Sequence, residues 1–356
     1  MPRVGSIVYA TKTGLGILAK SFYDNGIVDE VLIENHDHIK PNKEWYPNAN
    51  TIGPRKSVVD NVGGFPYYFR ATDTKKVEKF LDKIDVLLLF EVPFYYELID
   101  DAKKRNIKVI LMPMYEVTPY PIIADYYVCP SLLDLKFYKK MYPNTPSSFV
   151  PVPVDMPWKQ RTHAKTFVHN AGHGGTANRN GTMDILASMQ YVKSPIDLVV
   201  RCQATANSEA NPLITQIENF VLNSDDDRIS IQTETLKYED LFLEGDVFLF
   251  PERFNGLSLP LQEAYASGMA VMCGKRFPMT SWLPNELMVP VEKYETVSIV
   301  NVPFKQAKYD IKQIANTIDE WYSKDIKEYS LSGKAWAEKN SWEQIKPQYM
   351  EIINNV

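Results

Sequence analysis

Short runs of aliphatic and β-branched residues recur along the first half of the chain, with helix-like spacing of apolar residues between them. The apolar residues fill consecutive positions in these runs, which is typical of strands that are covered on both faces. The repeated order of strand and helix therefore predicts a doubly wound parallel sheet. The expected strands cover residues 6–9, 31–33, 86–90, 109–112 and 126–129, and the expected helices include 75–83 and 94–105.

Prolines become dense between residues 143 and 157. Because dense proline favours an extended, semi-rigid connection, we expect an inter-domain linker near residues 154–164. After this linker the alternation of strand and helix patterns begins again, which predicts a second α/β domain of similar size. Its expected strands cover residues 166–169, 198–200, 229–231, 247–250 and 270–272, and its expected helices cover 182–191, 260–267, 311–322 and about 341–355. Two such domains make a cleft, and the carboxyl ends of their strands are the usual ligand site.

Composition narrows the class of protein. The chain has 356 residues, of which 45% are apolar and 23% are charged, so it is globular and needs neither disulfides nor metals for stability. Disorder, collagen and coiled coil are excluded as descriptions of the whole chain. The balance of 39 Lys and Arg against 44 Asp and Glu gives a net charge of −5, which disfavours nucleic-acid or anionic-membrane binding over the whole surface.

The cysteines and the start of the chain indicate the compartment. Cys129, Cys202 and Cys273 are far apart in the sequence and odd in number, which favours a reducing compartment over a disulfide framework. Residues 1–6 lead into a strand without the apolar core of a signal peptide. No clean apolar run approaches the ~20 residues that span a bilayer. We therefore expect a soluble, cytoplasmic protein without a transmembrane segment.

A glycine-rich loop, Gly172-His173-Gly174-Gly175, lies between the expected strand at 166 and the expected helix at 182. Glycines there let the backbone approach a phosphate, whose charge the N–H groups and the helix dipole balance. Arg179 follows in the same loop and can pair with a diphosphate in a bidentate manner. The simpler alternative is a tight turn with an exposed arginine.

A second motif occupies residues 250–271, where a strand ends, a loop follows and Pro260 opens a helix. We expect Glu263 in the first turn of that helix, facing back toward the loop. A carboxylate at this position can accept two hydrogen bonds from a vicinal diol, such as the diol of a ribose.

Residues 250–271 resemble the motif of nucleotide-sugar-dependent glycosyltransferases of the GT-B fold, especially the retaining family 4. That pattern reads Glu-Gly-Phe-Gly, then four residues, then Glu-Ala, followed by a small residue, Gly and Pro-Val. The resemblance covers residues 172–271 well. In the first domain it is looser, and there 124–131 and 150–155 look like the closing strand and hinge of the family.

This resemblance implies an α/β fold of two Rossmann-like, doubly wound parallel-sheet domains that face each other across a cleft. Residues 1–153 would form the acceptor domain, and the final helix, about 341–356, would pack back on it. Residues 165–340 would form the nucleotide-sugar donor domain. The implied enzyme is a retaining hexosyl- or pentosyltransferase that needs no metal and no cofactor beyond its nucleotide-diphosphate sugar co-substrate.

In the second domain, this sequence matches the site residues of the family at some positions and differs from them at others. Glu263 matches the glutamate that holds the nucleotide ribose, while Asn255 stands where the family has the glutamate that contacts the donor sugar. Gly256 and Leu257 complete this loop. Gly172-His173 and Asn180-Gly181 occupy the places of the two cations that clamp the diphosphate, so the clamp is assigned to Arg179, with Arg253, Lys275 and Arg276 as neighbouring alternatives.

In the first domain, Gly14 and Gly16 follow the first strand, as the glycine loop near the diphosphate does in the family. Tyr115-Glu116 stands where the family often shows His-Asp. Glu116 and Glu91 are therefore candidate catalytic residues that contact the acceptor, together with Arg179 on the donor side. A carboxylate at a strand end is also often a helix cap.

The acceptor is open at this stage. A saccharide or lipid-linked saccharide is the family default. Residues 36–76 are basic and rich in aromatic residues, which suits stacking on sugars or on bases, so a double-stranded DNA acceptor carrying a hydroxymethylated base is an alternative. Another class of function is a nucleotide-sugar epimerase or a non-catalytic binding protein of the same fold.

Asp225-Asp226-Asp227 contains a DxD sequence, but its place before a strand favours a solvated turn over a metal site.

Overall fold

The computed structural model divides into two compact units. The first comprises Met1–Val152, Ser298–Val302 and Trp342–Val356, and the second comprises Pro153–Val297 and Pro303–Ser341. The structure describes residues 1–35, 40–54, 56–58, 68–91, 95, 97–114, 123–172, 178–202, 212–234, 236–255, 257–299 and 302–356.

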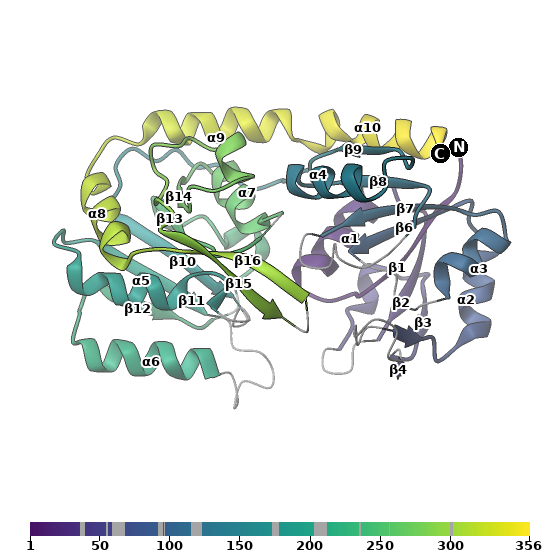
Figure 1. Cartoon of the computed structure of the whole chain (residues 1–356), viewed down its shortest axis with the longest axis horizontal. Helices are drawn as coiled ribbons and strands as arrows, with labels where there is room; N and C mark the ends of the chain where they lie inside the picture. Colours follow the sequence, from purple (N-terminus) through teal and green to yellow (C-terminus); the bar gives the residue numbers. More distant parts are fainter. Residues whose placement is uncertain are drawn as a thin grey trace. The chain divides into compact units, whose positions relative to one another are not determined.

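The first unit is built on a seven-stranded sheet of order β3-β2-β1-β6-β7-β8-β9 (Figure 1). All of its paired strands run parallel, as the continuous apolar runs predict. The strands are β1 (Val4–Val8), β2 (Glu30–Glu34), β3 (Asn50–Ile52), β6 (Val86–Glu91), β7 (Lys108–Pro113), β8 (Tyr126–Cys129) and β9 (Ser147–Phe149). The helices are α1 (Gly14–Asp24), α2 (Thr74–Leu81), α3 (Leu98–Lys104) and α4 (Leu132–Met141), with the short turn η1 (Lys43–Trp45) and the antiparallel pair β4 (Lys56–Val58) and β5 (Tyr68–Arg70).

The final helix, α10 (Trp342–Asn355), packs on this first unit, as the resemblance implied. The ring of Phe22 in α1 meets Trp342 and Tyr349 edge-on, at centroid distances of 5.1 and 4.9 Å. The hydroxyl of Tyr349 donates to the carbonyl of Pro151 at 3.2 Å. The chain therefore returns to its first sheet after completing the second.

The second unit contains a five-stranded parallel sheet of order β12-β11-β10-β13-β14. Its strands are β10 (Thr166–Gly172), β11 (Asp197–Cys202), β12 (Ile229–Gln232), β13 (Val247–Phe250) and β14 (Ala270–Cys273). Its helices are α5 (Thr182–Ser188), α6 (Pro212–Ser224), α7 (Leu259–Ala266), α8 (Ile311–Trp321) and α9 (Lys327–Lys339), with the short turns η4 (Met189–Tyr191), η6 (Tyr238–Asp240) and η7 (Met279–Ser281). Strands β15 (Lys293–Ile299) and β16 (Val302–Lys308) form a separate two-stranded sheet.

Alternate residues of the second sheet serve two different cores. Leu198 and Val200 of β11 lie in a buried cluster with apolar residues of α5, α6 and α8. Val168 and Phe248 face the other side, in a cluster with Leu261 and neighbouring residues of α7. These two layers identify the doubly wound fold that the sequence predicts. No helix among the described residues is long and apolar enough to cross a membrane.

The three cysteines are buried near the ends of their strands and carry free thiols. Burial raises the pKa of all three, and that of Cys202 to about 11. They are packing residues of β8, β11 and β14, and the sequence predicted no disulfide framework.

Candidate functional site

The end of β10 is held close to the loop that follows β13. Gly172, the last residue of β10, has a φ of +68°, and the side chain of Asn180 donates to the carbonyl of Ala171 at 3.1 Å. Gly181 caps α5 in the left-handed conformation, and a Cβ there would lie 2.6 Å from the carbonyl oxygen of Pro251. Glycine is thus required where the two loops meet. His173, Gly174 and Gly175 lie outside the described residues.

His169 anchors the first turn of α5 to the sheet. Its Nδ1–H donates to the carbonyl of Leu249 at 2.8 Å, so Nε2 accepts the hydroxyl of Thr182, also at 2.8 Å. Burial lowers the pKa of His169 to about 4, which keeps the ring neutral at physiological pH. A neutral tautomer with both nitrogens engaged fixes where the loop after β10 ends.

Arg179 lies in the turn between β10 and α5 and is half-buried. Its carbonyl accepts the backbone N–H of Arg253 at 2.7 Å, and its guanidinium carbon lies 5.5 Å from the ring centroid of Phe254. Arg253 forms a bidentate ion pair with Asp184 of α5, with nitrogen–oxygen distances of 2.7 to 3.0 Å. The structure therefore brings Arg179 to the 251–255 loop, while Arg253 is engaged by a carboxylate.

A buried ion pair supports that loop. Glu252 and Arg276 are 1% and 6% exposed, and the Arg276 guanidinium also donates to the carbonyl of Asn255 at 3.0 Å. The hydroxyl of Ser258 donates to Glu252 at 2.5 Å, and Tyr309 donates to the Glu252 carbonyl at 2.8 Å. We call Glu252, Ser258 and Arg276 the loop cluster. Burial raises the pKa of Glu252, while Arg276 and Ser258 oppose that shift.

Asn255 and Ser258 define the shape of the loop between β13 and α7. The Asn255 side-chain oxygen accepts the backbone N–H of Ser258 at 2.9 Å. Ser258 has a φ of +49°, a left-handed conformation that costs a non-glycine residue ~1–3 kcal/mol. Leu257 is buried, and its carbonyl accepts the Gln262 amide at 2.6 Å. Gly256 lies outside the described residues.

Glu263 is more enclosed than the sequence suggests. Helix α7 begins at Leu259, so Glu263 lies in its second turn, and the expectation of a first-turn position is wrong. Its side chain is buried, and one carboxylate oxygen accepts the hydroxyl of Tyr238 at 2.7 Å. Burial raises the pKa of Glu263 to about 7, although the Tyr238 hydrogen bond works in the opposite direction. Glu263 therefore titrates near neutral pH.

No protein-family model matches the chain, and no curated protein matches it in sequence. Its fold, by contrast, is found in several solved structures. HepE from Anabaena in complex with UDP aligns over 100% of both chains with a TM-score of 0.72 and 8% identity. Sucrose-phosphate synthase from Thermosynechococcus elongatus aligns over 100% of this chain and 99% of its own, with a TM-score of 0.65 and 14% identity. A glycosyltransferase from Rickettsia africae covers 98% and 97%, with a TM-score of 0.68 and 11% identity.

The chain has the GT-B glycosyltransferase fold. In the second unit, residues 250–271 span the end of β13, the following loop, helix α7 and the start of β14. The motif that carried the resemblance thus lies at the carboxyl end of a central strand, where ligands of parallel sheets bind.

The remaining predicted residues belong to the first GT-B unit. A Cβ at Gly16 would lie 1.9 Å from the carbonyl oxygen of Thr11, so glycine lets α1 begin close to the end of β1. Gly14 opens α1. Glu91 ends β6 with a φ of +69°, a strained backbone of the kind that is common at functional sites. Glu116 lies outside the described residues.

The sequence reasoning missed two residues of the site, Glu252 and Tyr238. Glu252 lies two residues after β13 and its partner Arg276 lies three residues after the neighbouring β14, so the parallel order of these strands could have paired them. Tyr238 lies in η6, a one-turn element with no apolar periodicity. No signal in the sequence points from Tyr238 to Glu263.

Proposed function

We propose that the protein is a retaining glycosyltransferase that moves a sugar from a nucleotide-diphosphate sugar to a hydroxyl acceptor. The observation that carries the proposal is the junction of the Arg179 turn with the 251–258 loop, next to the α7 helix that carries Glu263. HepE, which shares the fold, has been solved with UDP-glucose. We therefore propose a UDP-sugar as the donor.

The described side chains suggest a role for each part of the donor. Glu263 would accept hydrogen bonds from the ribose hydroxyls with the carboxylate oxygen that Tyr238 leaves open. Asn255 has its oxygen engaged by Ser258, so its amide nitrogen would donate to a hydroxyl of the sugar. The backbone at Gly172 and the Arg179 guanidinium would hold the diphosphate.

The reaction would break the bond between the sugar C1 and a phosphate oxygen and form a bond from C1 to the acceptor oxygen on the same face. The acceptor proton would pass to the departing phosphate oxygen. Arg179 stabilises this step because negative charge grows on the diphosphate as it leaves. Glu252 and Glu263 are both held by hydrogen bonds from within the unit, which suits supporting roles rather than a nucleophilic one.

The acceptor is proposed to be a saccharide or a lipid-linked saccharide, with Glu91 and Glu116 as its contacts in the first unit. Activity on such an acceptor should depend little on salt. A DNA acceptor would instead give a log–log salt slope of about −0.9 for each phosphate contact. Alanine at both Arg55 and Lys56 would then flatten the slope by about two. Parallel assays on labelled saccharide and hydroxymethylated duplex DNA separate these acceptors.

Ligand-induced thermal stabilisation tests the donor assignment. A nucleotide that binds only the folded state raises Tm by mass action, so UDP and UDP-glucose should raise it at millimolar concentration. Glu263→Gln should reduce the shift, whereas Glu239→Gln, an exposed carboxylate beside Tyr238, should leave it unchanged. Release of labelled sugar with and without acceptor distinguishes a transferase from an epimerase or a silent binding protein. The proposal fails if no nucleotide diphosphate or nucleotide sugar stabilises the protein.

A further inference from the structure

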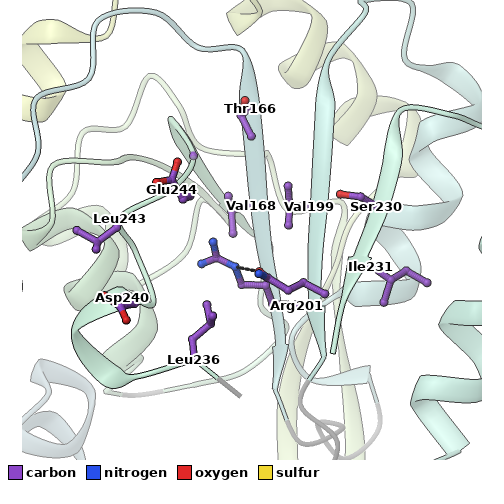
Figure 2. Close-up of a pocket in the computed structure, with 12 residues that line it drawn as sticks. Thr166, Val168, Val199, Arg201, Ser230, Ile231, Leu236, Asp240, Leu243 and Glu244 are labelled. Atoms are coloured by element: carbon purple, nitrogen blue, oxygen red, sulfur yellow. Dashed lines mark hydrogen bonds between the residues drawn. The ribbon is translucent and has the colours of Figure 1, made fainter. Parts of the chain in front are cut away.

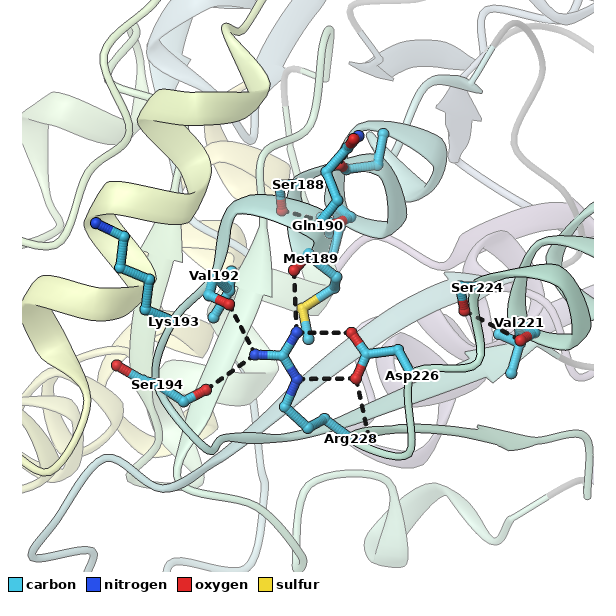
Figure 3. A network of polar contacts seen from close by, with 12 residues as sticks. Ser188, Met189, Gln190, Val192, Lys193, Ser194, Val221, Ser224, Asp226 and Arg228 are labelled. Atoms are coloured by element: carbon cyan, nitrogen blue, oxygen red, sulfur yellow. Dashed lines mark hydrogen bonds and ion pairs between the residues drawn. The ribbon is translucent and has the colours of Figure 1, made fainter.

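Three arginines of the second unit, the buried Arg161 and Arg201 and the partly buried Arg228, differ in how their N–H groups are used. A guanidinium has five N–H donors, and in a buried site each one needs an acceptor. Arg161 donates to five backbone carbonyls. Arg228 donates to three carbonyls and to both oxygens of Asp226 (Figure 3). These two side chains are saturated by the protein itself.

Arg201, near the carboxyl end of β11, is not saturated. Its Nε–H donates to the side-chain oxygen of Gln232 at 2.9 Å, and Nη1 donates to the carbonyl of Leu241. Within the described part of the chain, its other three N–H groups have no acceptor, although the residue is only 8% exposed. Both of its partners are neutral, so no carboxylate among the described residues forms an ion pair with it.

The unsatisfied guanidinium lines a hollow of about 530 Å³ on one face of the sheet (Figure 2). Strands β10, β11 and β12 form one wall, and the segment 236–245 forms the other. The lining includes apolar side chains from both walls, namely Val168, Val199, Leu236 and Leu243, whereas the side chain of Ile231 packs on the other face of the sheet. Figure 2 shows the Arg201 guanidinium between the sheet and the segment that carries Leu243. We call this space the Arg201 hollow.

Glu244 acts on Arg201 through its charge, but no ion pair joins the two among the described residues. Glu244 is 83% exposed and lies 4.0 Å from the ammonium group of Lys159. Asp240 also lines the hollow, but no ion pair joins it to Arg201 among the described residues. A buried cation with only neutral partners is costly, and an anionic ligand would remove that cost. Burial lowers the pKa of Arg201, and the charge of Glu244 offsets that shift only in part.

We propose that the Arg201 hollow binds a small organic carboxylate with an apolar body. The carboxylate would take the free N–H groups of Arg201 in a charge-assisted pair, and the body would cover the apolar wall. The volume lies within the range of ligand sites, roughly 300–1,000 Å³. The hollow reaches back to Thr166, at the start of β10, and to Gly245, before β13. None of its lining residues belongs to the proposed nucleotide-sugar site, although the segment 236–245 also carries Tyr238, the partner of Glu263.

Octanoate and its neutral analogue 1-octanol test this proposal by calorimetric titration of the full chain. We expect saturable binding of octanoate, at least about tenfold tighter than that of 1-octanol, since one charge-assisted contact is worth that much. Arg201→Met should abolish the preference for octanoate, and Arg201→Lys should keep part of it. Arg105→Met, an equal change of charge at the C-cap of α3 in the first unit, should leave both affinities unchanged.

Leu236→Trp provides a test that leaves Arg201 in place, because the larger side chain fills the hollow. Both ligands should then bind at least about tenfold more weakly. Equal affinity for octanoate and 1-octanol in the natural protein would overturn the proposal, and so would unchanged octanoate binding in Leu236→Trp. Thermal stabilisation by UDP, measured on the same samples, reports separately on the proposed glycosyltransferase site.

Discussion

Two arginine–carboxylate pairs of the second unit use the same chemistry at opposite ends of the sheet. Asp226 and Arg228 lie before β12, at the amino ends of the strands, and Glu252 and Arg276 follow β13 and β14, at the carboxyl ends. The first pair is 14% and 23% exposed, and the second is 1% and 6% exposed. Arg228 also bonds carbonyls of the 189–194 turn. This pair therefore has a structural role, because it joins the start of β12 to the 189–194 turn.

The loop cluster instead fixes a segment that carries proposed donor contacts. Arg276 donates to the Asn255 carbonyl, and Glu252 holds Ser258 in its left-handed conformation. Ligands of parallel sheets bind at the carboxyl ends of the strands. If the proposed function holds, the comparison predicts that the position of an ion pair along the strand, rather than its chemistry, decides whether the pair supports function.

Arg276→Met should give the largest effect, because it leaves the Glu252 carboxylate buried without its counter-ion. We expect the free energy of unfolding to fall by about 3–5 kcal/mol, with sugar transfer lost. Urea unfolding measures the first quantity and a donor assay the second. The double variant Glu252→Leu with Arg276→Met should recover much of the stability but not the transfer. Equal loss of transfer in variants of the amino-end pair would break the comparison.

Arg179→Ala tests whether residues at the carboxyl ends of the strands of the second sheet take part in sugar transfer. Turnover should fall about a hundredfold, since a fixed donor to developing charge contributes about 2.7 kcal/mol or more. The KM for the nucleotide sugar should change far less, because the interaction strengthens as the diphosphate leaves. Arg105→Ala, at the C-cap of α3, serves as the control. An unchanged kcat with a raised KM would assign Arg179 to ground-state binding.

Glu263→Gln should weaken nucleotide-sugar binding by about 1.5–3 kcal/mol, the value of hydrogen bonds to a charged group. Affinity of the natural protein should also fall as the pH drops below about 7, because protonation removes the acceptor carboxylate. The glutamine variant should lack this pH dependence. Calorimetric titration with UDP at pH 5.5 and 8 checks both, and identical profiles for the two proteins would contradict the ribose assignment.

The same residue predicts a pH dependence of stability with a definite sign. The pKa of Glu263 in the folded protein is about 7, above its ordinary value, so folding favours the protonated form. This contribution is complete at pH values below the ordinary glutamate pKa and is lost as the pH rises through 7. Glu263→Gln should therefore match the natural protein in Tm at pH 4 and exceed it at pH 8.

Asp226→Asn should give the smallest effect. The pair is partly exposed, so we expect a loss of about 1 kcal/mol in the free energy of unfolding and unchanged turnover. Urea unfolding beside Arg276→Met provides the matched measurement. If Asp226→Asn lowered the free energy of unfolding as much as Arg276→Met does, the difference in exposure between the two ends of the sheet would not explain how the two pairs differ.

Much of the fold could be predicted from the sequence, because buried parallel strands leave continuous apolar runs. The expected strands 126–129 and 247–250 agree with β8 and β13. Helix α9 was not predicted, since Ser330, Ser332 and Gly333 interrupt its apolar spacing. A Cβ at Gly333 would lie 2.1 Å from the carbonyl of Tyr265, so the glycine serves contact with α7. Such a requirement exists only in the packed structure.

The candidate site was predicted in part for the same reason. The spacing of residues 250–271 selected Glu263, but its burial and its bond to Tyr238 depend on a segment with no periodic pattern. Asn255 was selected by its place in the motif, whereas its bond to Ser258 follows from the left-handed backbone. Residue types could be read from the sequence, and hydrogen-bond partners could not.

The burial of all three thiols makes the protein a convenient subject for site-specific labelling. Thiolates are the species that react with maleimides, and the raised pKa values of Cys129, Cys202 and Cys273 leave few of them at neutral pH. A cysteine placed at Leu222, which is 80% exposed on α6, would therefore react far faster than the natural ones. Fluorophores can be attached there without first removing packed residues from three strands.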